Sequence, residues 1–193
     1  MINTVPNLLT LLRIALIPFI VVLYLTGALG IWVAGVFLLA GATDWLDGFL
    51  ARRMNQVSPF GEFLDPVADK LMIAVVLVML VSDRQVLNAA LSSSVFTVVT
   101  AIIIGREIGI SGLREWMAEV GSRTRVTVNQ MGKVKTTVQM IAITLLLYQG
   151  DLWIVPVFRV GEVLLYTAGM LTFWSMINYL RAAWPTLNRL EKD

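Results

Sequence analysis

The sequence predicts an all-α integral membrane protein: a single domain over residues 1–193, with a short N-terminal lead and six transmembrane helices. Hydrophobic residues make up 58% of the chain and the mean hydropathy is +0.79, values that would be unusual in a soluble domain. Six apolar runs alternate with short turns that contain glycine, proline or polar residues. Runs of roughly 20 apolar residues are what an α-helix needs to cross a bilayer.

The apolar runs give the limits of each predicted helix in order. The lead, residues 1–6, ends in Pro6, which suits the first turn of a helix. The pair Asp65–Pro66 suits the start of the third helix in the same way. The predicted helices span residues 7–25, 31–54, 65–81, 87–117, 132–148 and 157–180, with turns or loops at 27–30, 55–60, 82–85, 121–129 and 150–156.

The basic residues predict the orientation in the membrane. A path of six spans puts Arg84 and Arg159 on one side and the other 13 of the 15 Lys and Arg residues on the opposite side. Because cytoplasmic loops carry the excess of positive charge, that second side, with both termini, is predicted to be cytoplasmic. The net charge of +2 is too small to indicate a nucleic-acid partner.

Four aspartates stand out in this apolar chain. Asp44 and Asp47 are three residues apart, so they lie on one face of a predicted helix, and the four-residue spacing of Asp65 and Asp69 has the same effect. If the two faces meet, four carboxylates gather on the cytoplasmic side, where burying them without cations would be costly. The chain has no cysteine and no histidine, so oxygen atoms would ligate any metal, which favours Mg²⁺, Mn²⁺ or Ca²⁺.

The aspartates belong to a longer pattern, D-x2-D-G-x2-A-R, then eight residues, then G-x3-D-x3-D. Its members are Asp44, Asp47, Gly48, Ala51, Arg52, Gly61, Asp65 and Asp69. This pattern resembles the signature of the CDP-alcohol phosphotransferase family. The resemblance implies a membrane enzyme with six spanning helices, usually a homodimer, that moves a phosphatidyl-type group from a CDP-linked donor to an alcohol and releases CMP.

Three further stretches, residues 6–13, 105–116 and 132–137, are similar to one branch of that family. For that branch the resemblance implies CDP-diacylglycerol as the donor and sn-glycerol 3-phosphate as the acceptor. It also implies a role in phospholipid biosynthesis and a place in the bacterial inner membrane, with the active site on the cytoplasmic side.

The resemblance also implies roles for single residues. Asp44, Asp47 and Asp65 would ligate two Mg²⁺ or Mn²⁺ ions, which neutralise a pyrophosphate and clamp the attacking and leaving oxygens. Asp69 would be the general base for the acceptor hydroxyl, because no histidine is present, or else a fourth metal ligand only. The residues expected to contact CDP-diacylglycerol are Asn7, Gly48, Ala51, Arg52, Ser58 and Gly61. The two glycines among them also suit helix packing or a turn.

An acceptor that carries its own phosphate needs cations. Arg106, Lys133 and Lys135 lie at the predicted cytoplasmic ends of the fourth and fifth helices and suit that purpose. The alternative is a belt of positive charge that faces lipid headgroups. Arg13 interrupts the first apolar run, where it either meets an anion or extends its charge to the membrane surface.

Other functions remain open from the sequence. The signature does not separate sn-glycerol 3-phosphate from other acceptors in the family, such as serine, inositol phosphate or phosphatidylglycerol. Membrane prenyltransferases also use aspartate-rich Mg²⁺–diphosphate sites, but they generally have more helices than 193 residues supply. A cation carrier would place its carboxylates near the middle of the bilayer, whereas these fall at predicted helix ends.

Overall fold

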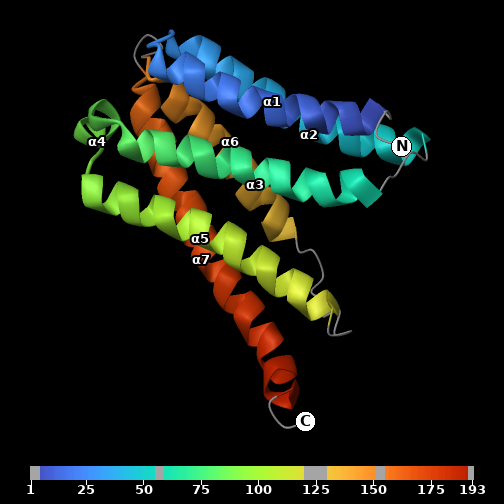
Figure 1. The fold of residues 1–193 in the computed structure, drawn as a ribbon. Helices are drawn as coiled ribbons and strands as arrows, with labels where there is room; N and C mark the ends of the chain where they lie inside the picture. The colour runs from blue at the N-terminus through green and yellow to red at the C-terminus, as the bar shows by residue number, and fades with distance from the viewer. Residues whose placement is uncertain (1–4, 55–58, 120–129, 151–154, 191–193) are drawn as a thin grey trace.

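The computed structural model describes residues 5–54, 59–119, 130–150 and 155–190, in which seven α-helices lie (Figure 1). They are α1 (Val5–Leu25), α2 (Gly30–Met54), α3 (Pro59–Ser82), α4 (Arg84–Ala89), α5 (Ser93–Glu119), α6 (Gln130–Tyr148) and α7 (Val157–Leu190). The predicted all-α class is confirmed. The apolar runs located α1 and α2 well, because both helices begin and end close to their predicted limits.

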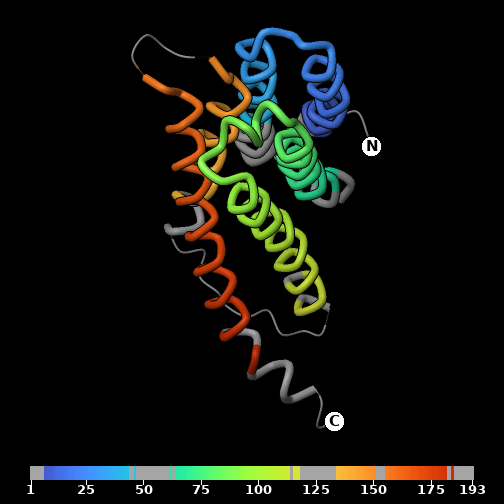
Figure 2. The backbone as a smooth tube through the Cα atoms, turned by 90° about the vertical axis from the view of Figure 1, so that its left-hand side faces the viewer, coloured from blue at the N-terminus to red at the C-terminus, as the bar shows by residue number. Residues whose placement is uncertain are grey.

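The helices form one bundle that is tight at the end carrying α4 and spread at the other end. α1, α2 and α3 run side by side, while α5 and α7 lead away from the α4 end in another direction (Figure 1). The same divergence is visible after a turn of 90° (Figure 2). α6 packs along both α2 and α7, and α3 packs on both α1 and α5. These two helices therefore connect the two groups.

Apolar side chains fill the bundle and also cover its outside. Phe37, Leu77, Phe96, Ile143 and Leu165, from five different helices, belong to one buried core. Large apolar side chains are also exposed along α1, α2, α5 and α7. An exterior of this kind suits contact with lipid rather than with water.

The described residues contain three helices that are long and apolar enough to cross a membrane: Asn7–Leu25, Ser93–Met117 and Val157–Arg181. Two shorter apolar helical stretches, Gly30–Thr43 and Val134–Tyr148, lie in α2 and α6. Together these stretches indicate a membrane protein, as the composition predicted.

The start of α3 differs from the prediction. The helix begins at Pro59 rather than at Asp65, so that Pro66 lies inside it. Both prolines have the fixed φ that suits a first helical turn, and the earlier one takes that position. Asp65 and Asp69 consequently lie in the second and third turns of α3 rather than at its end.

The chain between α3 and α5 also differs from the prediction of a simple polar loop. Asp83 caps α4 by accepting a hydrogen bond from the backbone N–H of Gln85 (2.7 Å), and α5 starts only at Ser93. Acidic and hydroxyl side chains compete with the helical backbone for such hydrogen bonds, so they break a run that hydropathy alone would continue.

At the C-terminal side, α7 reaches Leu190, beyond its predicted end at residue 180.

Glycine shapes the turn between α1 and α2. Gly27 has a positive φ of 72°, and its N–H donates to the Tyr24 carbonyl while the Ala28 N–H donates to the Leu23 carbonyl. This is the Schellman arrangement that ends a helix with a glycine. At Gly30 a Cβ atom would lie 1.9 Å from the carbonyl oxygen of Tyr148, so α2 approaches the end of α6 closely only because no side chain is present.

Polar side chains hold the tight end of the bundle together. Glu162 of α7 is fully buried and accepts hydrogen bonds from the Leu91 N–H (2.7 Å), the Tyr166 hydroxyl (2.6 Å) and Arg159 (3.0 Å). All of these donors come from α7 itself or from the corner between α4 and α5. A cavity of about 410 Å³ opens at this end, lined by Gln85, Val86, Ala89, Gln149, Pro156, Phe158 and Arg159.

Candidate active site

The signature residues lie where α2 ends and α3 begins, at the spread end of the bundle (Figure 1). The segment with Asp44 and Asp47 belongs to α2, so the predicted helical spacing of this pair is confirmed. The side chains of Asp44, Asp47, Ala51 and Arg52 and the surroundings of Gly48 lie outside what the structure describes, and Ser58 lies outside the described residues entirely.

Asp65 and Asp69 lie one turn apart on α3 and are bonded to side chains of α1. The Thr10 hydroxyl donates a hydrogen bond to Asp65 Oδ1 (2.5 Å). Arg13 Nη1 lies 2.6 Å from Asp69 Oδ1 in an ion pair. Thr10 and Arg13 are one helical turn apart, so two donors on α1 match two carboxylates on α3.

The buried Arg13 side chain on the apolar helix α1 is tolerated because it has an anionic partner. The Arg13 side chain is 0% exposed, whereas that of Asp69 is 36% exposed. A buried guanidinium without a partner would strongly destabilise the fold, and the carboxylate of Asp69 supplies that partner. Of the two expectations for Arg13, contact with an anion is confirmed, and the anion is a carboxylate of the protein itself. The membrane-surface alternative is wrong, because the side chain lies within the bundle.

Two residues predicted to contact CDP-diacylglycerol lie in the same region. Asn7 is 2% exposed and continues the stripe of Thr10 and Arg13 along α1, one turn earlier. Gly61 is buried in the first turn of α3. Contact between either residue and a nucleotide stays a prediction.

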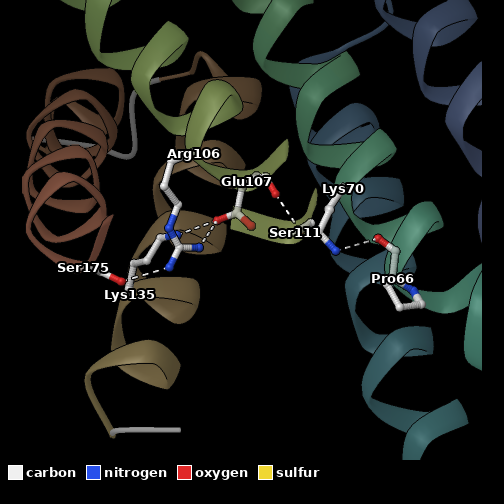
Figure 3. A network of polar contacts seen from close by, with 7 residues as sticks. All are labelled: Pro66, Lys70, Arg106, Glu107, Ser111, Lys135 and Ser175. Carbon is white, nitrogen blue, oxygen red and sulfur yellow. Dashed lines mark hydrogen bonds and ion pairs between the residues drawn. The ribbon is translucent and has the colours of Figure 1, made fainter. Parts of the chain in front are cut away.

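A second polar cluster joins α5, α6 and α7 (Figure 3). Glu107 Oε1 accepts from Lys135 Nζ (2.5 Å) and from Arg106 Nη1 (3.1 Å). Arg106 Nη2 also donates to Ser175 Oγ on α7 (2.9 Å). Two cations thus share one carboxylate oxygen, and the cluster keeps one net positive charge.

The burial of this cluster bears on whether its cations bind a phosphate or form a belt that faces lipid headgroups. The side chains of Arg106, Glu107 and Lys135 are 14%, 21% and 5% exposed. Burial of this degree favours contacts inside the bundle over a belt that faces lipid headgroups, and phosphate binding by Arg106 and Lys135 stays a prediction. The side chain of Lys133 lies outside the described residues. A surplus of buried positive charge, with forked and single donors, suits a phosphate.

α3 lies between the two clusters. It carries Asp65 and Asp69 against α1, and it also packs on α5, which carries Arg106 and Glu107. Lys70 follows Asp69 in the chain, but its Nζ atom donates to the Pro66 carbonyl of its own helix (3.2 Å; Figure 3). Lys70 therefore adds a charge near the carboxylates, while its Nζ atom contacts a backbone carbonyl and Arg13 contacts the Asp69 carboxylate.

Three members of these clusters were not predicted. Thr10 precedes Arg13 by three residues, and helical periodicity could have placed it on the same face. Glu107 follows Arg106 directly, so an acid beside a predicted phosphate-binding cation was a usable signal. Ser175 carried no signal, because its position depends on how α5 packs on α7.

The carboxylates of Asp65 and Asp69 are chemically suitable ligands for a divalent cation. Within the described residues, no group of three or more Asp, Glu, His or Cys side chains is placed to hold a metal ion. Asp65 and Asp69 are two of the four predicted ligands, and each is oriented by a donor on α1. Carboxylate oxygens are the ligands that Mg²⁺ and Mn²⁺ prefer, and such supporting bonds commonly orient ligands.

Comparison with known proteins agrees with this geometry. Residues 3–174 match the family described as CDP-alcohol phosphatidyltransferase. Proteins named CDP-diacylglycerol–glycerol-3-phosphate 3-phosphatidyltransferase from Salmonella typhimurium (strain LT2) and Shigella flexneri are each 48% identical over 181 residues, which is 93% of this chain and 94% of the relative. The protein of that name from Escherichia coli (strain K12) is 47% identical over the same shares. The chain therefore belongs to the CDP-alcohol phosphatidyltransferase family.

Proposed function

We propose that this protein is a phosphatidylglycerophosphate synthase, which transfers the phosphatidyl group of CDP-diacylglycerol to sn-glycerol 3-phosphate and releases CMP. The observation that carries the proposal is the 47–48% identity over nearly the whole chain to relatives named for this activity. The two polar clusters support it, because carboxylates suit the cations of a pyrophosphate donor and buried cations suit a phosphorylated acceptor.

The reaction moves one bond at phosphorus. The acceptor hydroxyl oxygen bonds to the phosphorus that carries diacylglycerol, and the bond from that phosphorus to the bridging oxygen breaks. CMP leaves with the bridging oxygen, and the hydroxyl proton passes to a base. We assign four carboxylates to hold two Mg²⁺ or Mn²⁺ ions: Asp44, Asp47, Asp65 and Asp69. When bound, such ions neutralise the pyrophosphate and stabilise the leaving oxygen.

Asp69 is also our candidate for the base that receives the hydroxyl proton, because the chain has no histidine. Its Oδ1 atom is held by Arg13 at 2.6 Å. Asp69 can accept the proton on Oδ1 once Arg13 releases that oxygen, or on its second carboxylate oxygen while Arg13 keeps Oδ1. The alternative is that Asp69 serves as a metal ligand only.

The donor is expected to lie over the junction of α2 and α3. The residues that we assign to CDP-diacylglycerol are Asn7, Gly48, Ala51, Arg52, Ser58 and Gly61. Asn7 and Gly61 support this placement by their positions, because each lies about one helical turn before a residue of the Thr10–Asp65 contact. Small residues there would let a nucleotide approach the backbone closely.

The acceptor phosphate is assigned to Arg106, Lys133 and Lys135. Arg106 offers a fork of donors and Lys135 a single charge. Both are bonded to Glu107, so the three side chains together carry one net positive charge. A phosphate monoester with two negative charges would be attracted by this surplus more strongly than serine, whose single carboxylate is offset by its own ammonium group. This difference favours a phosphorylated acceptor such as sn-glycerol 3-phosphate over serine.

We further propose a multi-pass protein of the bacterial inner membrane, with six spans and both termini in the cytoplasm. α2, α3 and α6 would complete the set begun by the three long apolar helices, while α4, with six residues, is too short to cross. The concentration of Lys and Arg on one side supports this orientation. A homodimer is expected from the family.

An assay of CMP release tests the proposal. Purified protein in detergent–lipid micelles with CDP-diacylglycerol and Mg²⁺ should release CMP only when sn-glycerol 3-phosphate is added, and EDTA should stop the release. Release that required serine, inositol phosphate or phosphatidylglycerol instead would keep the family but overturn the acceptor. A prenyltransferase or a cation carrier would release no CMP with any of these alcohols.

A further inference from the structure

The contact between Arg13 and Asp69 has a consequence for cation binding. Arg13 is among the largest fully buried side chains of the described structure, and its charged end lies 2.6 Å from Asp69 Oδ1. A buried charge on an apolar helix is costly, so a fold retains it where it meets an opposite charge. The opposite charge here is a carboxylate that we assign to the binding of divalent ions.

We propose that Arg13 is a resident cation of the carboxylate site: it holds Asp69 while the site lacks divalent ions, and it competes with them when they bind. The inference rests on the proposed function only in requiring that divalent ions bind at these aspartates. Four aspartates within one site repel one another in the absence of cations, and a fixed guanidinium beside one of them reduces that repulsion.

The same charge acts against the divalent ion. An ion that approaches Asp69 meets a fixed positive charge a few ångströms away, in surroundings where Coulomb interactions are screened less than in water. Arg13 therefore stabilises the metal-free fold and weakens cation affinity. A residue that only oriented Asp69 would do the opposite, because losing it would weaken metal binding.

Thr10 provides an internal comparison. Its hydroxyl donates to Asp65 Oδ1 at 2.5 Å, one turn before Arg13 on the same helix. The hydroxyl can orient the carboxylate but carries no charge that opposes a cation. Substitutions of the two α1 donors are thus expected to change cation affinity in opposite directions. Loss of the Thr10 hydroxyl should weaken cation binding slightly, and loss of the Arg13 charge should strengthen it.

The test compares wild-type protein with Arg13→Gln, which keeps an N–H donor and removes the charge. Mn²⁺ binding to purified protein in detergent is measured by the loss of the free-ion electron paramagnetic resonance signal, and thermal unfolding is followed by tryptophan fluorescence with EDTA or with Mg²⁺. We expect Arg13→Gln to bind Mn²⁺ roughly tenfold more tightly. In EDTA the Tm of Arg13→Gln should be lower than that of wild-type protein. Adding Mg²⁺ should raise the Tm of Arg13→Gln by more than it raises the Tm of wild-type protein.

Three matched variants control the comparison. Lys70→Gln removes the same charge one residue from Asp69, and Thr10→Val removes a contact without removing a charge. Thr10→Val should not increase the Mg²⁺-dependent rise in Tm, and Lys70→Gln should increase it less than Arg13→Gln does, because Lys70 Nζ contacts the Pro66 carbonyl and not a carboxylate. Arg13→Lys keeps the charge and should restore most of the wild-type Mn²⁺ affinity.

Each outcome decides the matter. Equal losses of Tm in EDTA and in Mg²⁺, or weaker Mn²⁺ binding by Arg13→Gln, would overturn the inference. If Arg13→Gln is folded only in Mg²⁺ and unfolds on chelation, the inference is supported, whereas failure to fold even in Mg²⁺ overturns it. Wild-type protein that binds no Mn²⁺ would instead refute the cation site of the proposed function, which is a separate failure.

Discussion

Replacing Lys135 by methionine should impair binding of the acceptor and spare the donor. Lys135 is 5% exposed, and methionine has a similar length, so the apolar part of the side chain keeps its packing. Glu107 is left with Arg106 at 3.1 Å, so its carboxylate stays paired after the substitution. The change therefore removes a charge without creating an unpaired one.

The expected rise in the KM for sn-glycerol 3-phosphate follows from the charges of the Arg106, Glu107 and Lys135 side chains. Wild-type protein presents two cations and one carboxylate to the acceptor phosphate, and the variant presents one of each. A hydrogen bond to a charged group contributes about 1.5–3 kcal/mol, which corresponds to a rise of roughly 10- to 150-fold in the KM for sn-glycerol 3-phosphate. The KM for CDP-diacylglycerol should change by less than about threefold, since the donor is assigned to the α2–α3 junction.

CMP release measures both constants, with one substrate varied while the other is saturating. Lys70→Met is the matched control, because it makes the same substitution on α3, where the Nζ atom donates only to the Pro66 carbonyl among the contacts in Figure 3. Equal rises in the KM values of donor and acceptor, or an unchanged KM for the acceptor, would show that Lys135 does not bind the phosphate. A matching fall in Tm would point to a structural role.

Three other predictions concern the carboxylates and the packing of the bundle. Asp65→Asn should lower kcat roughly 100-fold or more and raise the Mg²⁺ concentration needed for half-maximal CMP release, because an amide is a weaker ligand than a carboxylate. Asp69→Asn should lower kcat by about 10²- to 10⁴-fold if Asp69 is the base, and a near-normal rate would remove that role. Gly30→Ala should lower the free energy of unfolding by about 1–3 kcal/mol, because the new Cβ atom would lie 1.9 Å from the Tyr148 carbonyl oxygen. Gly35→Ala, with nothing within 4 Å of its new Cβ atom, should leave the Tm unchanged or slightly raised.

Much of the fold could be predicted from the sequence, because apolar length is the main signal of a membrane helix. α1 ends where its apolar run ends, and α2 continues past its apolar part, Gly30–Thr43, along the amphipathic pattern to Met54. The errors arose where local chemistry decides a boundary: Pro59 starts α3 ahead of Pro66, and Asp83 caps α4. Beyond residue 180, α7 continues although the run becomes polar, because a helix outside the hydrocarbon needs no apolar pattern.

The site could be predicted in composition but not in its contacts. The spacing of Asp65 and Asp69 placed them on one face of a helix, and the signature identified the family. The ion pair of Arg13 with Asp69 joins residues 56 positions apart, and it depends on how α1 lies along α3. The bond between Lys135 and Glu107 depends in the same way on packing among α5, α6 and α7. Such registers are properties of tertiary structure, which periodicity within one helix does not determine.

The buried carboxylate of Glu162 has a mechanical consequence. One of its three hydrogen bonds, from the Leu91 N–H, joins α7 to the corner between α4 and α5, while Arg159 and Tyr166 of α7 hold the carboxylate in place. This contact lies at the end of the bundle farthest from the signature residues (Figure 1). We expect that end to act as a pivot, so that a two-chain lipid would be accommodated by changes in the tilt of α1–α3 against α5 and α7. Because tilt responds to bilayer thickness, we expect the rate of the reaction to vary with the acyl-chain length of the surrounding lipid.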